Sequence, residues 1–286
     1  MGYLPTSSSR RQAVLEKKRQ EYRNLTEKHF IVTGDGKFDN EASREKADQA
    51  IFHQISIDVP RTCPELELFR ETATREAMVR ILYCWSIRRP ASGYVQGIND
   101  ILTPFFSVFA SEYSYPLSTR DLFSIEVDTF WCLSKLLDGI QDNYTFSQSG
   151  IYRQINYLKE IVQRIDPILY KHFEKEGIDY VQFAFRWMNC LLLREFPLHL
   201  LVRIFDSYMA EGEDGFSTFH TFVCAAFLLK WSQRLQLLDF QDIIIFLQAP
   251  PTSHWTEKDI ETLLSEAFVL KSLFSESLFR KSFTST

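Results

Sequence analysis

The chain of 286 residues has few cysteines, no long apolar run and little strand-like alternation. Its five cysteines are widely scattered and form no C-x-x-C pair, which favours buried thiols in a reducing compartment over disulfides or zinc ligands. No apolar run reaches the roughly 20 residues that span a membrane, and the N-terminus has no signal-peptide core. These absences predict a cytoplasmic protein without a transmembrane segment.

Motifs for nucleotide, nucleophile and metal chemistry are also missing. The sequence contains no G-x-x-x-x-G-K-[ST], no G-x-G-x-x-G and no G-x-S-x-G. Its six histidines are dispersed and never form H-E-x-x-H. A calcium loop beginning at Asp35 fails because Lys37 and Lys46 stand where carboxylates belong. We therefore expect no bound cofactor, no metal and no self-contained hydrolytic site.

Charge limits the partners further. The net charge of −5 argues against nucleic acid. One basic stretch, residues 10–28, holds seven Lys or Arg against three Glu. We interpret it as the solvated face of a helix, with a phosphate- or lipid-binding patch as the alternative. The opening residues 1–6 satisfy the bare myristoylation pattern, which is too short to support a claim.

Helical periodicity runs through most of the sequence. Met78, Ile81, Leu82 and Trp85 recur at i, i+3, i+4 and i+7, and Pro90 ends this pattern. Strand alternation is scarce, and no hairpin signal is present. The sequence thus predicts an all-α fold of roughly a dozen helices. Comparable apolar stripes lie at 123–137, 151–162, 180–194, 199–210, 217–231 and 257–274.

Polar stretches suggest how the chain is divided. Residues 33–48 are interpreted as a flexible connector that leads into a helix. The stretch 141–150 lies near the midpoint of the chain and is the best candidate for a boundary. We therefore predict two helical subdomains, residues 1–146 and 147–286.

A first notable loop surrounds Arg61, which lies between Pro60 and Pro64. Each proline favours extended backbone in the residue before it, so an α-helix cannot continue through this segment. Arg61 is therefore predicted to project from a stiff turn. The structural alternative is a surface salt bridge with Asp58, worth about 0–1 kcal/mol.

A second loop surrounds Gln96, which lies between Gly93 and Gly97. Glycine permits positive φ and a close approach of the backbone to a partner. Asn99 and Asp100 offer an N-cap for an apolar helix over 101–109. The structural alternative for Gln96 is a turn residue that binds local backbone groups.

The two loops together indicate a chemistry that neither indicates alone. GTP hydrolysis by a Ras-like GTPase is accelerated by a cation that stabilises the charge on the transferring phosphoryl group and by an amide that orients the attacking water. An exposed arginine and an exposed glutamine meet these two needs.

Several motifs resemble one known family. Residues 57–62 (Ile-Asp-Val-Pro-Arg-Thr) and 92–100 (Ser-Gly-Tyr-Val-Gln-Gly-Ile-Asn-Asp) are similar to the arginine-finger and glutamine-finger motifs of TBC-domain Rab GTPase-activating proteins. Within that family the resemblance is to the subfamily of a yeast Golgi Rab GAP and its animal relatives, and it covers nearly the whole chain. Further similar stretches follow in the same order at 130–132, 136–138, 142–144 and 182–189.

The resemblance implies a fold, a partner and roles for residues. The fold would be an all-helical V of two subdomains. Arg61 would be the arginine finger and Gln96 the glutamine finger, both supplied in trans to a GTP-bound Rab that itself holds the GTP and Mg²⁺. Asp58 would position Arg61. The residues that support or shape the two fingers would be Asp58, Pro60, Thr62, Gly93, Tyr94, Gly97 and Asn99.

The chain departs from the family pattern at Arg89 and Phe205, among other places, and other functions stay open. Arg89 precedes Pro90 where the subfamily usually has His, and Phe205 stands where the family commonly has Trp. Alternatives are a catalytically inactive TBC-fold scaffold that binds Rabs and a helical adaptor unrelated to GTPases. The resemblance also implies a location at Golgi or endosomal membranes, reached through the Rab or through flanking regions.

Overall fold

A computed structural model of the chain describes residues 4–32, 38–39 and 46–283. The chain divides into two compact units, Met1–Ser147 and Gln148–Thr286. The predicted all-α class is confirmed. The subdomain boundary predicted at 146/147 stays a prediction about folding units. Most of the connector expected at 33–48 lies outside the described residues.

One short strand pair was not predicted. Strand β1 (Ile31–Val32) pairs antiparallel with β2 (Phe38–Asp39). Each strand has two residues, which is too short for apolar alternation to be visible in the sequence.

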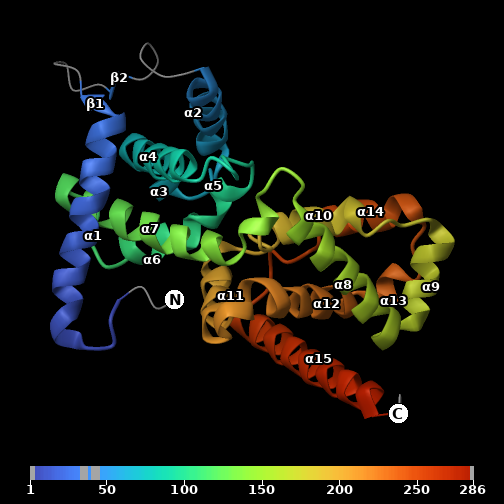
Figure 1. The fold of residues 1–286 in the computed structure, drawn as a ribbon. Coiled ribbons are helices and arrows are strands. Elements are labelled where there is room, and N and C mark those ends of the chain that lie inside the picture. Colours follow the sequence, from blue (N-terminus) through green and yellow to red (C-terminus); the bar gives the residue numbers. More distant parts are fainter. Residues whose placement is uncertain (1–3, 33–37, 40–45, 284–286) are drawn as a thin grey trace. The chain divides into compact units, whose positions relative to one another are not determined.

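The first unit is built around the long helix α4. Its stripe of Met78, Ile81, Leu82 and Trp85 is buried, as the periodicity predicted. The helix ends at Arg88, two residues before Pro90. It packs against α1, α2 and α7, and Figure 1 shows it among them. The helices of this unit are α1 (Ser8–His29), α2 (Lys46–Asp58), α3 (Glu67–Arg70), α4 (Thr72–Arg88), α5 (Ile98–Ile101), α6 (Thr103–Ala110) and α7 (Thr119–Gly139), with 3₁₀ turns at Val59–Arg61 and Gln141–Asn143.

A buried polar cluster ties three of these helices together. Arg80 of α4 donates two hydrogen bonds to the Glu126 carboxylate of α7, at 2.8 and 2.7 Å. The Tyr22 hydroxyl of α1 donates to the same carboxylate at 2.7 Å. Burial lowers the pKa of Arg80, but hydrogen bonding and charge attraction from the Glu126 carboxylate outweigh that effect and raise it, so Arg80 stays protonated. This cluster fixes α1, α4 and α7 in register.

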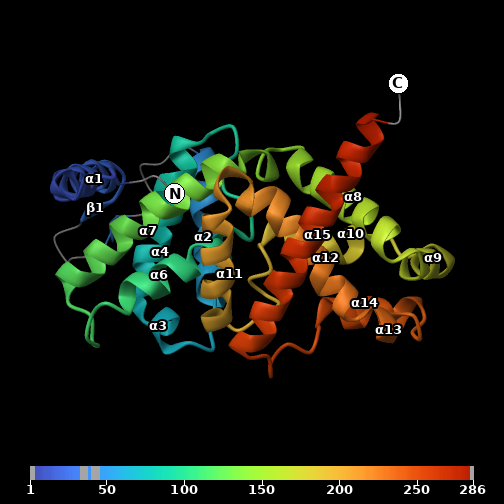
Figure 2. The ribbon, with the colours of Figure 1, turned by 90° about the horizontal axis from the view of Figure 1, so that it is seen from below.

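The second unit is centred on α12, which packs against α8 and α15. Figure 2 shows α12 and α15 side by side. The helices of this unit are α8 (Ser149–Ile165), α9 (Pro167–Glu176), α10 (Val181–Asn189), α11 (Leu198–Ala210), α12 (His220–Lys230), α13 (Ser232–Leu235), α14 (Phe240–Gln248) and α15 (Glu257–Phe283), with a 3₁₀ turn at Gly212–Asp214 and a π turn at Gly215–Phe219.

Two apolar runs in this unit are not continuous α-helices. The run 180–194 leaves the helix after Asn189, and Leu191 and Leu192 adopt positive φ of 51° and 62°. Both leucines are buried, so the apolar pattern continues although the backbone turns. The run 217–231 begins within the π turn, before α12. A Cβ on Gly215 would lie 1.8 Å from the Tyr208 carbonyl oxygen, so the close approach to α11 requires glycine.

In the described part of the chain, no helix has the length and apolar character that crossing a membrane requires.

Candidate functional site

Arg61 ends a single 3₁₀ turn that directly follows α2. The turn spans Val59–Arg61 with Pro60 in it, and the Thr62 N–H closes it by donating to the Val59 carbonyl at 3.1 Å. The α-helix stops where the prolines predicted, but the segment is a regular turn rather than irregular backbone. The Arg61 side chain is exposed, and its guanidinium has no hydrogen-bond or ion-pair partner among the described residues. Arg61 is therefore a cation available to an incoming anion.

Asp58 is not the partner of Arg61. This carboxylate is only 3% exposed. Its Oδ2 accepts hydrogen bonds from the Tyr94 hydroxyl at 2.9 Å and from Gln54 Nε2 at 3.2 Å. The salt bridge between Asp58 and Arg61 is therefore wrong as an alternative, because Asp58 is directed to the second loop. Gln54 was not predicted as a supporting residue, although its i, i+4 spacing from Asp58 on a helix could have indicated this contact.

The second loop begins immediately after α4. The N–H groups of Ser92 and Gly93 both donate to the Arg89 carbonyl, at 3.0 and 2.8 Å. Gly93 has φ of 63° and Gly97 has φ of 110°, a backbone region that favours glycine. The Gln96 side chain is exposed between them. Both glycines thus have the conformational role that the sequence predicted.

The helix after this loop begins earlier than predicted. Gly97 is the N-cap residue of α5, and Asn99 and Asp100 lie inside that short helix. A separate helix, α6, then begins at Thr103. The predicted N-cap at Asn99 and Asp100 and the single helix over 101–109 were therefore wrong. The physical reason is that the Asn99 carboxamide binds groups of the two loops instead of a helix end.

Asn99 is buried and joins the loops directly. Its Oδ1 accepts a hydrogen bond from the Gly97 N–H at 2.9 Å, and the Tyr94 hydroxyl lies 3.1 Å from the same oxygen. Its Nδ2 donates to Thr62 Oγ1 at 3.0 Å. Thr62 in turn donates to the Asp58 carbonyl at 3.0 Å. We call Asp58, Thr62, Tyr94 and Asn99 the loop network.

The loop network accounts for most of the predicted supporting residues. Its four members share hydrogen bonds between the two loops, whereas Pro60, Gly93 and Gly97 shape the backbone. Because Asp58, Thr62 and Asn99 are buried, the network limits how far the loops can move apart. Arg61 and Gln96 remain exposed. The two loops thus present one cation, Arg61, and one amide, Gln96, on backbone that the loop network restrains. The amide can both donate and accept hydrogen bonds, whereas the guanidinium only donates.

Metal chemistry has no visible site in this region. In the parts of the chain that the structure describes, no three His, Cys, Asp or Glu side chains are grouped as metal ligands.

Comparison with known proteins identifies the family. The sequence profile described as "Rab-GTPase-TBC domain" matches residues 11–238, a range that includes both loops. The chain belongs to this family.

The family members that resemble the chain include fungal and human proteins. It is 52% identical over 285 residues to "GTPase-activating protein gyp1" of Schizosaccharomyces pombe, which covers 96% of this chain and 54% of that protein. It is 48% identical over 286 residues to human "TBC1 domain family member 22B", with 96% and 54% coverage. The chain therefore spans about half the length of the curated relatives that it matches.

A solved structure of the family shares the fold. The crystal structure of the Ypt/Rab-GAP domain of Gyp1p aligns with a TM-score of 0.87 and 46% sequence identity. The alignment covers 96% of this chain and 85% of that chain. The helical order described above is thus the order of a TBC domain.

Proposed function

We propose that this chain is a GTPase-activating protein for a GTP-bound Rab GTPase. Membership of the Rab-GTPase-TBC domain family supports this proposal, as does the name of the yeast relative, "GTPase-activating protein gyp1". The observation that carries it is the pair of exposed side chains, Arg61 and Gln96, on two loops joined by the buried Asn99.

In the proposed mechanism Arg61 supplies positive charge to the Rab active site. Charge spreads over the oxygens of the transferring phosphoryl group, and a guanidinium can pair with two of them at once. Arg61 suits this role because no described carboxylate competes for it. An arginine finger of this kind accelerates hydrolysis by 10³–10⁵, or about 4–7 kcal/mol of barrier.

Gln96 is proposed to orient the attacking water. An amide can accept a hydrogen bond from water through its oxygen and donate one through its nitrogen, which fixes the direction of attack. Water orientation needs a defined geometry, since a displacement of about 1 Å can cost roughly 100-fold in rate. The positive φ of Gly97 and its bond to Asn99 supply that definition beside Gln96.

The remaining components belong to the partner. The Rab holds the GTP and the Mg²⁺, so this chain contributes side chains and no cofactor of its own. Residues 1–146 form the subdomain with both fingers, and residues 147–286 form the second. The chain reaches Golgi or endosomal membranes as a peripheral protein, through the Rab or through regions that flank it.

A panel of GTP-loaded Rabs in single-turnover phosphate release tests this proposal. We expect one or two Rabs to respond strongly to the chain. Arg61→Ala should reduce the stimulated rate of phosphate release by a factor of 10³–10⁵. It should leave thermal stability unchanged, because the Arg61 side chain has no hydrogen-bond or ion-pair partner among the described residues. Gln96→Ala should also collapse the stimulation. Arg70→Ala, which removes an exposed arginine from α3, is the matched control and should retain full activity.

Two outcomes would overturn the proposal. Stable binding of a GTP-loaded Rab without faster phosphate release would identify a TBC-fold scaffold. Equal affinity for GTP- and GDP-loaded Rabs, or none for either, would leave a helical adaptor.

A further inference from the structure

A pocket of about 240 Å³ lies on the first unit, lined by residues of α1, α4 and α7 and by Arg89, which follows α4. This pocket is separate from the candidate site, because neither Arg61 nor Gln96 lines it. Its lining residues are Lys18, Trp85, Arg88, Arg89, Phe130, Trp131, Ser134, Lys135 and Asp138. We call it the basic pocket.

The lining has a clear excess of positive charge. Four of the lining side chains are cationic and only Asp138 is anionic. Arg88 and Lys135 are exposed and have no carboxylate partner among the described residues. In a chain whose net charge is −5, such a concentration is a local feature and not a reflection of composition. It favours a multiply charged anion.

The other two cations have weak competitors. Arg89 binds Asp138 Oδ1 through Nε at 3.0 Å and through Nη2 at 2.6 Å, but the two side chains are 32% and 42% exposed. Lys18 binds Glu21 at 2.8 Å with similar exposure. Exposed pairs of this kind contribute about 0–1 kcal/mol, so a multiply charged ligand can compete with either carboxylate.

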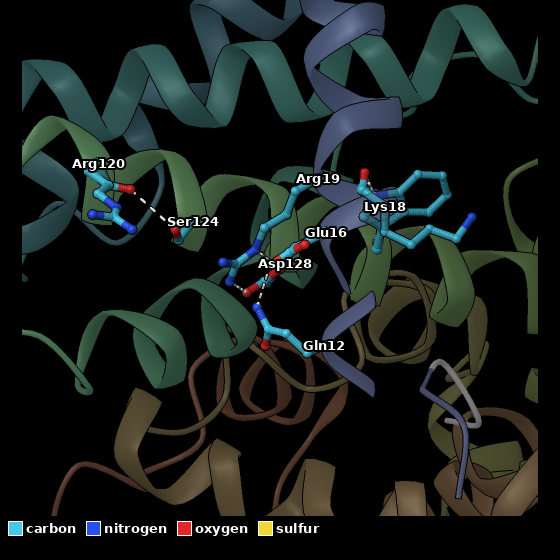
Figure 3. A network of polar contacts seen from close by, with 8 residues as sticks. Gln12, Glu16, Lys18, Arg19, Arg120, Ser124 and Asp128 are labelled. Atoms are coloured by element: carbon cyan, nitrogen blue, oxygen red, sulfur yellow. Dashed lines mark hydrogen bonds and ion pairs between the residues drawn. The ribbon is translucent and has the colours of Figure 1, made fainter. Parts of the chain in front are cut away.

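Lys18 is held in place by an aromatic wall. Its ammonium lies 3.9 Å from the centroid of the Trp131 ring, and the Trp131 indole N–H donates to the Lys18 carbonyl at 3.0 Å. Figure 3 shows Lys18 and its neighbour Arg19 directed away from one another. Arg19 is neutralised by Asp128, at 2.6 Å. Of the basic stretch 10–28, Lys18 is thus the residue placed for a ligand in this pocket.

Size and lining narrow the ligand. The volume is below the roughly 300–1,000 Å³ of pockets for drug-sized ligands, and larger than a single water needs. Trp85 and Phe130 form a rigid buried part of the wall. Arginine and lysine together bind phosphate oxygens more strongly than neutral donors do. A small group with one or more phosphates fits this combination.

We propose that the basic pocket binds the phosphate groups of a small phosphorylated molecule, either free or as the headgroup of a lipid. This site is independent of the proposed GTPase activation. Arg89, which lines the pocket, also contacts the start of the second loop, because its carbonyl accepts the N–H groups of Ser92 and Gly93. Arg89, which stands where the subfamily usually has His, therefore lies between the basic pocket and the second loop.

Calorimetry and vesicle flotation test the proposal. The probes are inositol 1,4,5-trisphosphate in solution, and phosphatidylcholine vesicles with and without phosphatidylinositol 4,5-bisphosphate. We expect the chain to bind the soluble or the membrane probe, and Arg88→Gln/Lys135→Gln to weaken that binding at least tenfold. The charge-matched control is Lys17→Gln/Arg120→Gln, which removes two exposed cations from α1 and α7 outside the pocket. It should weaken binding less than twofold.

The two probes separate the sources of the phosphate. Comparable binding of the soluble probe and the vesicles indicates a free phosphorylated ligand, whereas retention on phosphoinositide vesicles alone indicates a lipid headgroup. If neither the soluble probe nor the vesicles bind up to millimolar concentration, the proposal is overturned. Equal weakening by both double variants would also overturn it, because general attraction between charges would then explain the binding. Neither variant breaks an ion pair with a carboxylate of the described structure. The pocket variant loses only the contacts of Arg88 with the Phe130 and Trp131 rings, which contribute about 0.5–1 kcal/mol at an exposed site, so both variants should fold.

Discussion

Asn99 is the residue on which the geometry of the two loops depends. Its oxygen accepts from Gly97 in the second loop, and its nitrogen donates to Thr62 in the first. Because the Asn99 carboxamide is buried and hydrogen-bonded through both its oxygen and its nitrogen, it is held in one conformation. It therefore restrains the backbone of both loops. The exposed Arg61 and Gln96 need such support, because a long side chain on a free loop would lose conformational entropy whenever it entered a partner.

We expect Asn99→Ala to reduce both stability and stimulation of the Rab. The substitution leaves the buried Gly97 N–H without an acceptor, which costs about 1–3 kcal/mol, and phosphate release should fall at least tenfold as the loops loosen. Tyr94→Phe should have a smaller effect, because Asp58 keeps its bond from Gln54. Urea unfolding and single-turnover phosphate release measure the two consequences.

The control for this variant is Asn24→Ala on α1. The Asn24 side chain is exposed, and its hydrogen bond in the described structure is to the Gln20 side chain of the same helix. Asn24→Ala should change neither quantity. Full stimulation by Asn99→Ala would show that the loop network does not position the fingers.

At the scale of elements, a buried histidine joins three helices of the second unit. His220 of α12 lies with Nε2 at 3.1 Å from the Trp187 carbonyl of α10 and with Nδ1 at 2.8 Å from the Tyr208 hydroxyl of α11. Burial raises the pKa of Tyr208, which therefore keeps its proton and donates it to Nδ1. The neutral tautomer with hydrogen on Nε2 satisfies both contacts. Burial lowers the pKa of His220 to about 4.

This histidine should make the stability of the fold fall in mild acid. In the unfolded chain the imidazole binds a proton near its ordinary pKa of about 6.5. Above that pH its contribution is fully present, and it is lost as pH falls towards the folded pKa of about 4. Between pH 7 and pH 5 we expect a loss of about 2 kcal/mol from this group. The measurement is urea unfolding at both pH values.

His220→Gln isolates this contribution. The variant should be less stable at pH 7 but lose about 2 kcal/mol less than the wild type on going to pH 5. His254→Gln, at an exposed position, should keep the wild-type dependence. An unchanged slope in His220→Gln would show that other groups cause the acid sensitivity.

At the scale of the whole molecule, both proposed fingers belong to the same compact unit. Arg61 and Gln96 lie within Met1–Ser147, and the loop network connects their loops within one chain. A single chain can therefore present the cation and the amide to one Rab. The second unit contributes neither side chain.

This placement predicts that two defective chains cannot repair one another. An equimolar mixture of Arg61→Ala and Gln96→Ala should stimulate phosphate release no more than either variant alone, because each Rab meets one chain at a time. Mixtures of each variant with the wild type should retain activity in proportion to the wild type. Recovery in the mixture of the two variants would mean that two chains share one GTPase.

Local sequence patterns determined the class of fold, the ends of several helices and the candidate residues. The stripe over 78–85 became the buried face of α4, and α4 ends two residues before Pro90. The prolines and glycines marked both loops, since these residues restrict or release φ wherever they stand. Such signals act within one or two turns of the chain, which is the range that periodicity covers.

Tertiary structure decided what these local patterns could not specify. Asn99 reaches Thr62 across 37 residues and Tyr94 reaches Asp58 across 36, so Asn99 holds the loops and not a helix end. Leu191 and Leu192 continue an apolar run but turn with positive φ. Lys18, Arg88 and Lys135 form one pocket only because three helices meet. Each of these outcomes depends on contacts between residues far apart in the sequence. The energies of such contacts override local propensity and cannot be inferred from the spacing of neighbouring residues.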